Sequence, residues 1–193
     1  MSTDKTVEAL RDYVREHADD FLDDPNVIAI GECGLDYHYD FAPHSIQRDA
    51  FKAQLDLAEK LDLPVIIHNR EATADTLDLL ETYHGQGVVH CFSGSVETMS
   101  TMLKKGLYIG FTGIVTFKNA RRAVEAVQAC PLDRLLVETD APYMAPEPLR
   151  GRRCDSGMLA YTVACIADIK GISPAKLISI TAENARRLFK IKQ

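Results

Sequence analysis

The chain has 193 residues, a length that predicts one compact domain of about 100–200 residues. Hydrophobic residues make up 46% of the chain and charged residues 26%, which excludes a disordered or collagen-like protein because a substantial apolar core can form. The net charge of −6 predicts a surface that does not attract polyanions as a whole, so a nucleic-acid substrate would require a local basic patch or a metal ion.

Short apolar runs alternate with longer amphipathic stretches along the chain, a pattern typical of strand-helix units around a parallel sheet. An amphipathic helix is predicted first, over residues 4–21, although an α/β domain normally begins with a strand. Buried strands are predicted at Val27–Ile30, Pro64–Ile67, Gly87–Val89, Leu107–Phe111 and Arg134–Val137. Helices are predicted at residues 44–62, 72–83, 95–105, 118–129 and 156–170, followed by a last helix with its cap near Thr181. The lack of a low-complexity linker predicts a single domain over residues 1–193.

Targeting and redox features of the sequence favour a cytoplasmic protein without a membrane partner. No apolar run approaches the ~18–20 residues that cross a bilayer, and the first residues lack the basic start and apolar stretch of a signal peptide. The five cysteines are odd in number and scattered, with no Cys-x-x-Cys pair. Reduced thiols in a reducing compartment are therefore expected.

Side chains that bind metals stand at the ends of four predicted strands. Glu32, His68, His90 and Asp140 follow the first, second, third and fifth apolar runs. Because the carboxyl ends of parallel strands carry the functional loops of such folds, we expect these four residues to lie close together. Imidazole nitrogen and carboxylate oxygen are ligands of Zn²⁺, Mn²⁺ and Fe²⁺, and carboxylates alone suit Mg²⁺. The sequence thus predicts a divalent metal site.

Each of these residues also has a structural interpretation when it is taken alone. Glu32 is suited to cap the turn that follows it or to pair with Arg70, as lone carboxylates usually do. A single histidine such as His68 or His90 is more often a satisfied core residue, and Asp140 is suited to a turn before a proline. The metal site is preferred because four independent structural roles at four strand ends are a less economical explanation.

Other polar residues leave more than one interpretation open. His38 lies in the loop after the first run and either is solvated or faces substrate, while Cys33 and Cys91 are expected to be small buried residues. The basic group Lys118–Arg122 favours a solvated face. Arg150–Arg153 lies in a loop beside the predicted site, where phosphate contact is at least as well supported as solvation.

Five segments, taken together, resemble the signatures of a known enzyme family. They are Gly31–Tyr37 (GECGLDY), Pro64–Arg70 (PVIIHNR), His90–Gly94 (HCFSG), Glu138–Tyr143 (ETDAPY) and Thr181–Phe189 (TAENARRLF). In this order and spacing they resemble the TatD family of metal-dependent deoxyribonucleases, and the resemblance covers nearly the whole chain.

The resemblance implies a (β/α)8 TIM-barrel of the amidohydrolase kind, with a two-metal centre that hydrolyses phosphodiester bonds in DNA. In this sequence Glu32 would bridge the metals, and His68 and His90 would bind one of them. Asp140 would bind metal and act as the catalytic residue that orients or deprotonates the attacking water. The metal identity, Mg²⁺, Mn²⁺ or Zn²⁺, stays open because mixed ligand sets accept several cations.

The resemblance also assigns residues around this centre. Arg70 and Arg152 would hold the phosphates of the DNA substrate, and Glu138 would orient a metal ligand. These assignments complete the set of expected site residues.

The chain departs from the family pattern in two places. It has no His-x-His pair, which in the family stands on the first strand and completes the second metal site, and Cys154–Ser156 replaces the family's Asn-Glu-Pro after the retained Gly151–Arg153. A barrel of this type has typically about 250 residues. We therefore expect an incomplete barrel that lacks its first two strand-helix units, one metal rather than two, and impaired nuclease activity. Either an internal start about 60–70 residues into a longer protein or a natural short homologue would explain this.

Two other functions remain alternatives to a phosphodiesterase. One is a catalytically silent metal-binding or scaffold protein that keeps part of the fold, and the other is a related metal-dependent hydrolase of amides or esters. An incomplete barrel would also expose strand edges, which favours a homo-oligomer unless the helix at residues 4–21 covers an edge.

Overall fold

The structure is a computed structural model that describes residues 27–39 and 41–191. The chain divides into two compact units, Met1–Gln86 and Gly87–Gln193, and each has its own parallel strands and helices. The predicted α/β class is confirmed, whereas the helix expected at residues 4–21 lies outside the described residues. Within the described ranges, no helix has the length and apolar character that would carry it across a bilayer.

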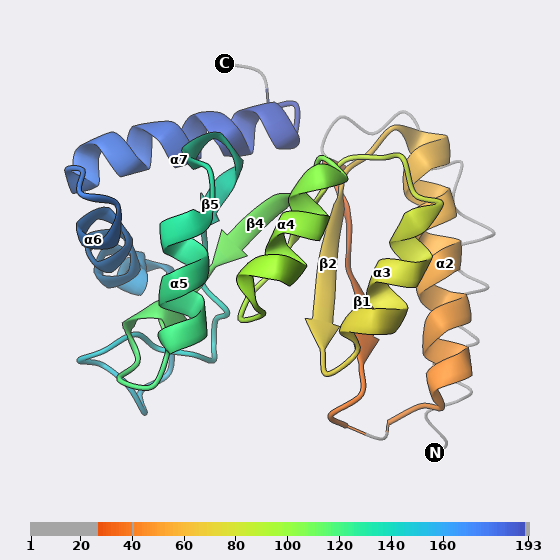
Figure 1. The fold of residues 1–193 in the computed structure, drawn as a ribbon, viewed down its shortest axis with the longest axis horizontal. Coiled ribbons are helices and arrows are strands. Elements are labelled where there is room, and N and C mark those ends of the chain that lie inside the picture. The colour runs from red at the N-terminus through yellow and green to blue at the C-terminus, as the bar shows by residue number, and fades with distance from the viewer. Residues whose placement is uncertain (1–26, 40, 192–193) are drawn as a thin grey trace. The chain divides into compact units, whose positions relative to one another are not determined.

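The described part of the first unit contains the parallel strands β1 (Ile30–Asp36) and β2 (Val65–Arg70) and the helices α2 (His44–Leu61) and α3 (Thr73–Glu81) (Figure 1). Strand β1 pairs in parallel with β2, α2 packs against β1, and α3 packs against β2. The side chains of Leu35, Phe51 and Ile67 are completely buried between these elements. Burial of one such side chain contributes roughly 1.5–3 kcal/mol, so this core fixes how the two strands lie against α2.

The second unit places strand β4 between two parallel neighbours. Strands β3 (Gly87–Val89), β4 (Tyr108–Phe111) and β5 (Leu135–Val137) form this sheet, and Tyr108, Ile109 and Phe111 of β4 are buried. The helices of the unit are α4 (Val96–Lys104), α5 (Arg121–Ala129), α6 (Leu159–Lys170) and α7 (Pro174–Leu188). Short 3-10 segments η2 (Gly113–Thr116), η3 (Leu132–Arg134) and η4 (Ser156–Met158) connect them.

A buried amide fastens α7 to the start of β5. The side-chain nitrogen of Asn184 donates hydrogen bonds to the carbonyl oxygens of Leu132 and Leu135 at 2.7 and 2.9 Å. Asn184 is 2% exposed, so these bonds satisfy donors that would otherwise be costly to bury. The C-terminal helix thereby holds in place the strand that leads to Glu138 and Asp140.

The first strand begins three residues later than the apolar run predicts. Residues Val27–Ala29 are outside any strand, and Ile28 is 43% exposed, so the expectation of a buried strand at Val27–Ile30 is wrong. The hydrogen-bonding partner decides the boundaries, because β2 continues to Arg70 and pairs there with Asp36. Glu32 and His68 consequently lie within strands rather than beyond their ends.

The last helix begins at Pro174, so the cap expected near Thr181 is also wrong. The Ser173 hydroxyl accepts a hydrogen bond from the Lys176 N–H at 3.3 Å, and proline follows it at the first helical position, which together form a strong helix start. Thr181 lies inside the helix, where its hydroxyl donates to the Leu177 carbonyl at 3.0 Å. The other strands and helices predicted within the described residues are confirmed, apart from small differences at their ends.

Candidate metal centre

In the first unit, one histidine lies between two carboxylates. We call Glu32, Asp36 and His68 the His68 cluster. Nδ1 of His68 is 2.8 Å from Oε1 of Glu32, and Nε2 is 3.2 Å from Oδ2 of Asp36. The side chains of His68, Glu32 and Asp36 are 33%, 48% and 27% exposed, so the cluster is open to solvent. Both ring nitrogens thus face an acidic group.

The electrostatics of the His68 cluster follow from these contacts. The hydrogen bond to Glu32 raises the pKa of His68, and Asp36 adds to the effect although burial opposes it. Burial alone raises the pKa of Asp36, but the backbone N–H groups of Tyr39 and His38 and the His68 ring outweigh it, so this pKa is lowered. The cluster is therefore an acidic pair that favours a bound positive charge.

Strand geometry explains why these side chains meet. Glu32 and Asp36 stand four residues apart on β1, and alternation along a strand places them on one face while Cys33 and Leu35 are buried on the other. Gly34 pairs with His68 at a φ of 149°, and a Cβ there would overlap the His68 carbonyl oxygen. Only glycine allows this close approach of the two strands.

In the second unit, another histidine lies between two carboxylates. His90, Glu138 and Asp140, with the neighbouring Cys91, form what we call the His90 cluster. Nδ1 of His90 is 3.0 Å from Oε1 of Glu138, and Nε2 is 3.5 Å from Oδ1 of Asp140. The side chains of His90, Glu138 and Asp140 are 12%, 22% and 30% exposed. Burial therefore distinguishes this cluster from the one around His68.

The backbone fixes Glu138 in its position. Its Oε1 accepts a hydrogen bond from the Cys91 N–H at 2.6 Å, in addition to its contact with His90. Gly110 on β4 leaves room for this carboxylate, since a Cβ at residue 110 would overlap Oε1 of Glu138. Glu138 thus holds the His90 ring from Nδ1 and leaves Nε2 on the side of Asp140.

Cys91 differs from the expectation that it is a small buried residue. Cys33 is buried at 5% exposure, but Cys91 is only partly buried and has a φ of 49°. One possible ligand atom from each of His90, Cys91 and Asp140 lies within 4.8 Å of the others. These three residues could therefore hold one metal ion if their ligand atoms moved slightly closer together.

The structure joins the predicted ligands in two pairs. Glu32 lies beside His68 in the first unit, and His90 lies beside Asp140 in the second. The meeting of all four residues at one place stays a prediction.

Sequence reasoning missed Asp36. A signal existed, because Asp36 follows Glu32 by four residues within the segment Gly31–Tyr37. It became visible only once β1 was known to extend to Asp36, since the predicted strand ended at Ile30.

Basic residues lie outside these clusters and differ in their surroundings. The Arg70 guanidinium lies 4.9 Å from the centre of the Tyr39 ring. Arg152 is exposed, and its backbone N–H donates to the Leu149 carbonyl at 3.1 Å. Arg121, 89% exposed, pairs with Glu125 on α5, which agrees with a solvated face.

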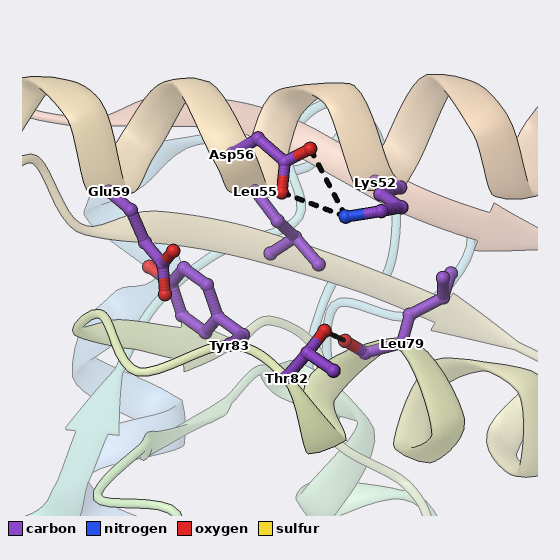
Figure 2. A pocket seen from close by; sticks show the side chains of 7 residues that line it. All are labelled: Lys52, Leu55, Asp56, Glu59, Leu79, Thr82 and Tyr83. Carbon is purple, nitrogen blue, oxygen red and sulfur yellow. Dashed lines mark hydrogen bonds and ion pairs between the residues drawn. The ribbon is translucent and has the colours of Figure 1, made fainter.

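A small pocket of the first unit does not contain the predicted site. Figure 2 shows it between α2 and α3, with Lys52 donating to both carboxylate oxygens of Asp56 at 3.0 and 3.1 Å. Its volume is about 10 Å³, room for about one water molecule. Its lining residues are Lys52, Leu55, Asp56, Glu59, Leu79, Thr82 and Tyr83, none of which belongs to either histidine cluster.

The parallel α/β fold thus carries two acidic histidine clusters, and the His90 cluster has the composition of a group that could hold a metal ion. The model of the TatD related DNase family matches residues 3–190, and the chain belongs to this family. A crystal structure of a TatD homologue, YJJV of Escherichia coli K12, superposes with a TM-score of 0.85 at 27% identity and covers 98% of this chain and 72% of that one.

Curated relatives carry related names. The chain is 45% identical over 168 residues to YabD of Bacillus subtilis (strain 168), named an uncharacterized metal-dependent hydrolase. It is 43% identical over 175 residues to the 3'-5' ssDNA/RNA exonuclease TatD of Rahnella sp. (strain Y9602). Each match covers 86% of this chain and 66% of the relative, so the chain spans slightly less than two thirds of these proteins.

Proposed function

We propose that the chain is a metal-dependent phosphodiester hydrolase of the deoxyribonuclease type. The observation that carries the proposal is that two histidines, His68 and His90, each contact two carboxylates within their own unit. A metal-bound histidine commonly uses one ring nitrogen for the cation and donates from the other to a carboxylate, and neighbouring carboxylates balance the metal charge, so acidic groups at both nitrogens favour a cation site.

The residues of both clusters fit a divalent cation. Glu32 and His68 in the first unit and His90 and Asp140 in the second offer carboxylate oxygen and imidazole nitrogen, the donors that Zn²⁺ and Mn²⁺ accept. Glu138 contacts Nδ1 of His90 and thereby holds the ring, so that Nε2 is the nitrogen that would bind a cation. When bound, a divalent cation neutralises charge on a phosphate and lowers the pKa of an adjacent water.

Asp140 is the proposed catalytic residue of the chain. It lies beyond β5, where its partly exposed carboxylate can accept the proton of an attacking water. No side-chain nucleophile is needed for this reaction, because water itself attacks the phosphorus. The chain has no His-x-His pair, so we expect one firmly held cation and weak cleavage.

Single-stranded DNA is the preferred substrate in this proposal. The Rahnella relative is named a 3'-5' ssDNA/RNA exonuclease, and the net charge of −6 requires local cations to hold a polyanion. Arg70 and Arg152 are the residues proposed to contact phosphate, with a (β/α)8-type barrel as the proposed architecture. The alternative is a metal-binding protein without catalysis, which the missing His-x-His pair favours.

Metal stoichiometry and cleavage of single-stranded DNA in Mg²⁺ or Mn²⁺ test this proposal. The wild-type chain is expected to bind cation and to cleave, and Glu32→Gln to lose cleavage. Glu183→Gln on α7 is a matched control, because Glu183 is exposed and pairs only with the nearby Arg187 among the described contacts. Bound metal without any cleavage would support the non-catalytic alternative, and cleavage unchanged in Glu32→Gln would refute the role of Glu32.

A further inference from the structure

An exposed pair of aromatic rings lies just beyond β1. The Tyr39 and Phe41 rings are stacked, with centroids 5.2 Å apart and planes 21° from parallel. Tyr39 is 44% exposed and Phe41 71% exposed. Single exposed apolar residues are common on protein surfaces, but two stacked rings open to solvent leave a flat apolar face without an evident structural purpose.

A cation completes this surface. The Arg70 guanidinium lies 4.9 Å from the centre of the Tyr39 ring, within the range of a cation–π interaction. The backbone sets this arrangement, because the Tyr37 N–H donates to the Arg70 carbonyl at 2.9 Å and Asp36 pairs with Arg70 in the sheet. The guanidinium therefore lies over the Tyr39 ring, which is itself stacked with Phe41.

The rings are attached to the His68 cluster through one carboxylate. Oδ1 of Asp36 accepts hydrogen bonds from the backbone N–H groups of His38 and Tyr39 at 2.9 and 3.2 Å. Oδ2 of the same residue contacts Nε2 of His68. Asp36 thus orders the loop that carries Tyr39 and, at the same time, forms part of the candidate metal centre.

Acidic side chains lie near the rings, and each of them contacts a histidine. Glu71, the acidic side chain in contact with His38, is paired with its ring at 2.8 Å, and the His38 ring meets Tyr39 edge-on with centroids 4.8 Å apart. Arg70 provides the positive charge next to the stacked rings. Every nucleobase has a flat π face, so this combination fits the bases and phosphates of a single strand, and paired bases inside a duplex do not expose such faces.

We propose that Tyr39, Phe41 and Arg70 form a stacking platform that binds bases of single-stranded nucleic acid beside the His68 cluster. The inference rests on the proposed nuclease function and identifies residues that select single strands. Tyr39 and Phe41 are positioning residues in this role, since they hold the strand and do not take part in bond cleavage.

Equilibrium binding tests the platform independently of cleavage. The probes are a fluorescein-labelled short oligothymidylate and an abasic strand of the same length, which keeps the phosphates and lacks the bases. The full chain is expected to bind oligothymidylate more tightly than the abasic strand. Phe41→Ala and Tyr39→Ala should each weaken oligothymidylate binding about ten-fold and leave binding of the abasic strand unchanged.

Matched variants separate stacking from general damage. Phe41→Trp should retain oligothymidylate binding, because it keeps an aromatic face. Tyr161→Ala on α6 should leave oligothymidylate binding unchanged, since Tyr161 is 43% exposed and lies in the other unit. If Phe41→Ala weakened binding of oligothymidylate and of the abasic strand equally, or weakened neither, the platform would be refuted. Failure of the wild-type chain to cleave DNA would count against the nuclease function, whereas selective binding of bases would still support the platform.

Discussion

The His68 cluster and the His90 cluster place the same chemical groups in different surroundings. In both, a histidine contacts carboxylates through its two ring nitrogens. His68 is 33% exposed and Glu32 is 48% exposed, whereas His90 is 12% exposed and Glu138 is 22% exposed. The first cluster is therefore the more exposed, and each cluster has one carboxylate held by backbone N–H groups, Asp36 by those of His38 and Tyr39 and Glu138 by that of Cys91.

The comparison shows that the same contact between a histidine and two carboxylates can be held in place in two ways. Around His68, the close approach of two strands at Gly34 brings the groups together. Around His90, the carboxylate of Glu138 is itself fixed by the Cys91 N–H. We therefore expect substitutions in the first cluster to act through strand spacing, and those in the second to act through buried hydrogen bonds.

The largest effect is expected for Gly34→Ala. The new Cβ would overlap backbone atoms of His68 at a φ of 149°, so the strands must separate and the free energy of unfolding should fall by about 3 kcal/mol or more. Urea denaturation measures this loss. Gly106→Ala is the control. Its φ of 81° gives the same kind of backbone strain, but no atom lies within 4 Å of the new Cβ, so the free energy of unfolding should fall by only about 1 kcal/mol. Equal losses of unfolding free energy in Gly34→Ala and Gly106→Ala would contradict the view that the close approach of β1 and β2 causes the loss in Gly34→Ala.

The second largest effect on stability is expected when a carboxylate is removed, and it should differ between the two clusters. Glu138→Ala leaves the partly buried Cys91 N–H without its acceptor and should lower stability by about 1–3 kcal/mol. Glu32→Ala removes a half-exposed side chain and should change stability by about 0.5 kcal/mol or less. Both variants should lose metal-dependent cleavage, as measured on single-stranded DNA. A stability loss as large for Glu32→Ala as for Glu138→Ala would remove the distinction.

Thiol alkylation provides a probe of the His90 cluster alone. Burial raises the pKa of Cys33 and of Cys130 to about 12, so both should react slowly with iodoacetamide. Cys91 and Cys165 are partly exposed and should react first. Added Zn²⁺ should slow the labelling of Cys91 but leave Cys165 unchanged, as mass spectrometry of peptides would show. Equal protection of Cys165 would indicate that the cation does not act at Cys91.

The smallest effect is expected beside the His68 cluster, at Asp75 on α3. Hydrogen bonds from Tyr37 and Arg48 lower the pKa of Asp75, so its folded value lies below its unfolded value of about 3.9. The stabilisation is present above the unfolded pKa and is lost as pH falls through the folded pKa. Asp75→Asn should therefore lower Tm slightly at neutral pH, with the difference from wild type vanishing in strong acid. A difference that persists in strong acid would exclude ionisation of Asp75 as its source.

Sequence patterns located most elements and the family motifs correctly. Apolar runs identified β3, β4, β5 and the first part of β2, because buried strands are continuous apolar segments. Hydrophobicity failed for β1, where Val27–Ala29 is apolar without being a strand, since pairing with β2 decides where a strand lies. The cap of α7 was misplaced although Ser173 and Pro174 signal it locally.

The sequence by itself determined the α/β class, the family and the residue types available for metal chemistry, because these depend on local periodicity and on motifs that are continuous in the chain. Only the tertiary structure decided that Asp36 joins His68, that Glu138 accepts the Cys91 N–H, and that Arg70 lies over Tyr39. The physical reason is that each of these contacts joins different strands or loops. Their distances depend on register, glycine spacing and burial, which become fixed only when the strands pair.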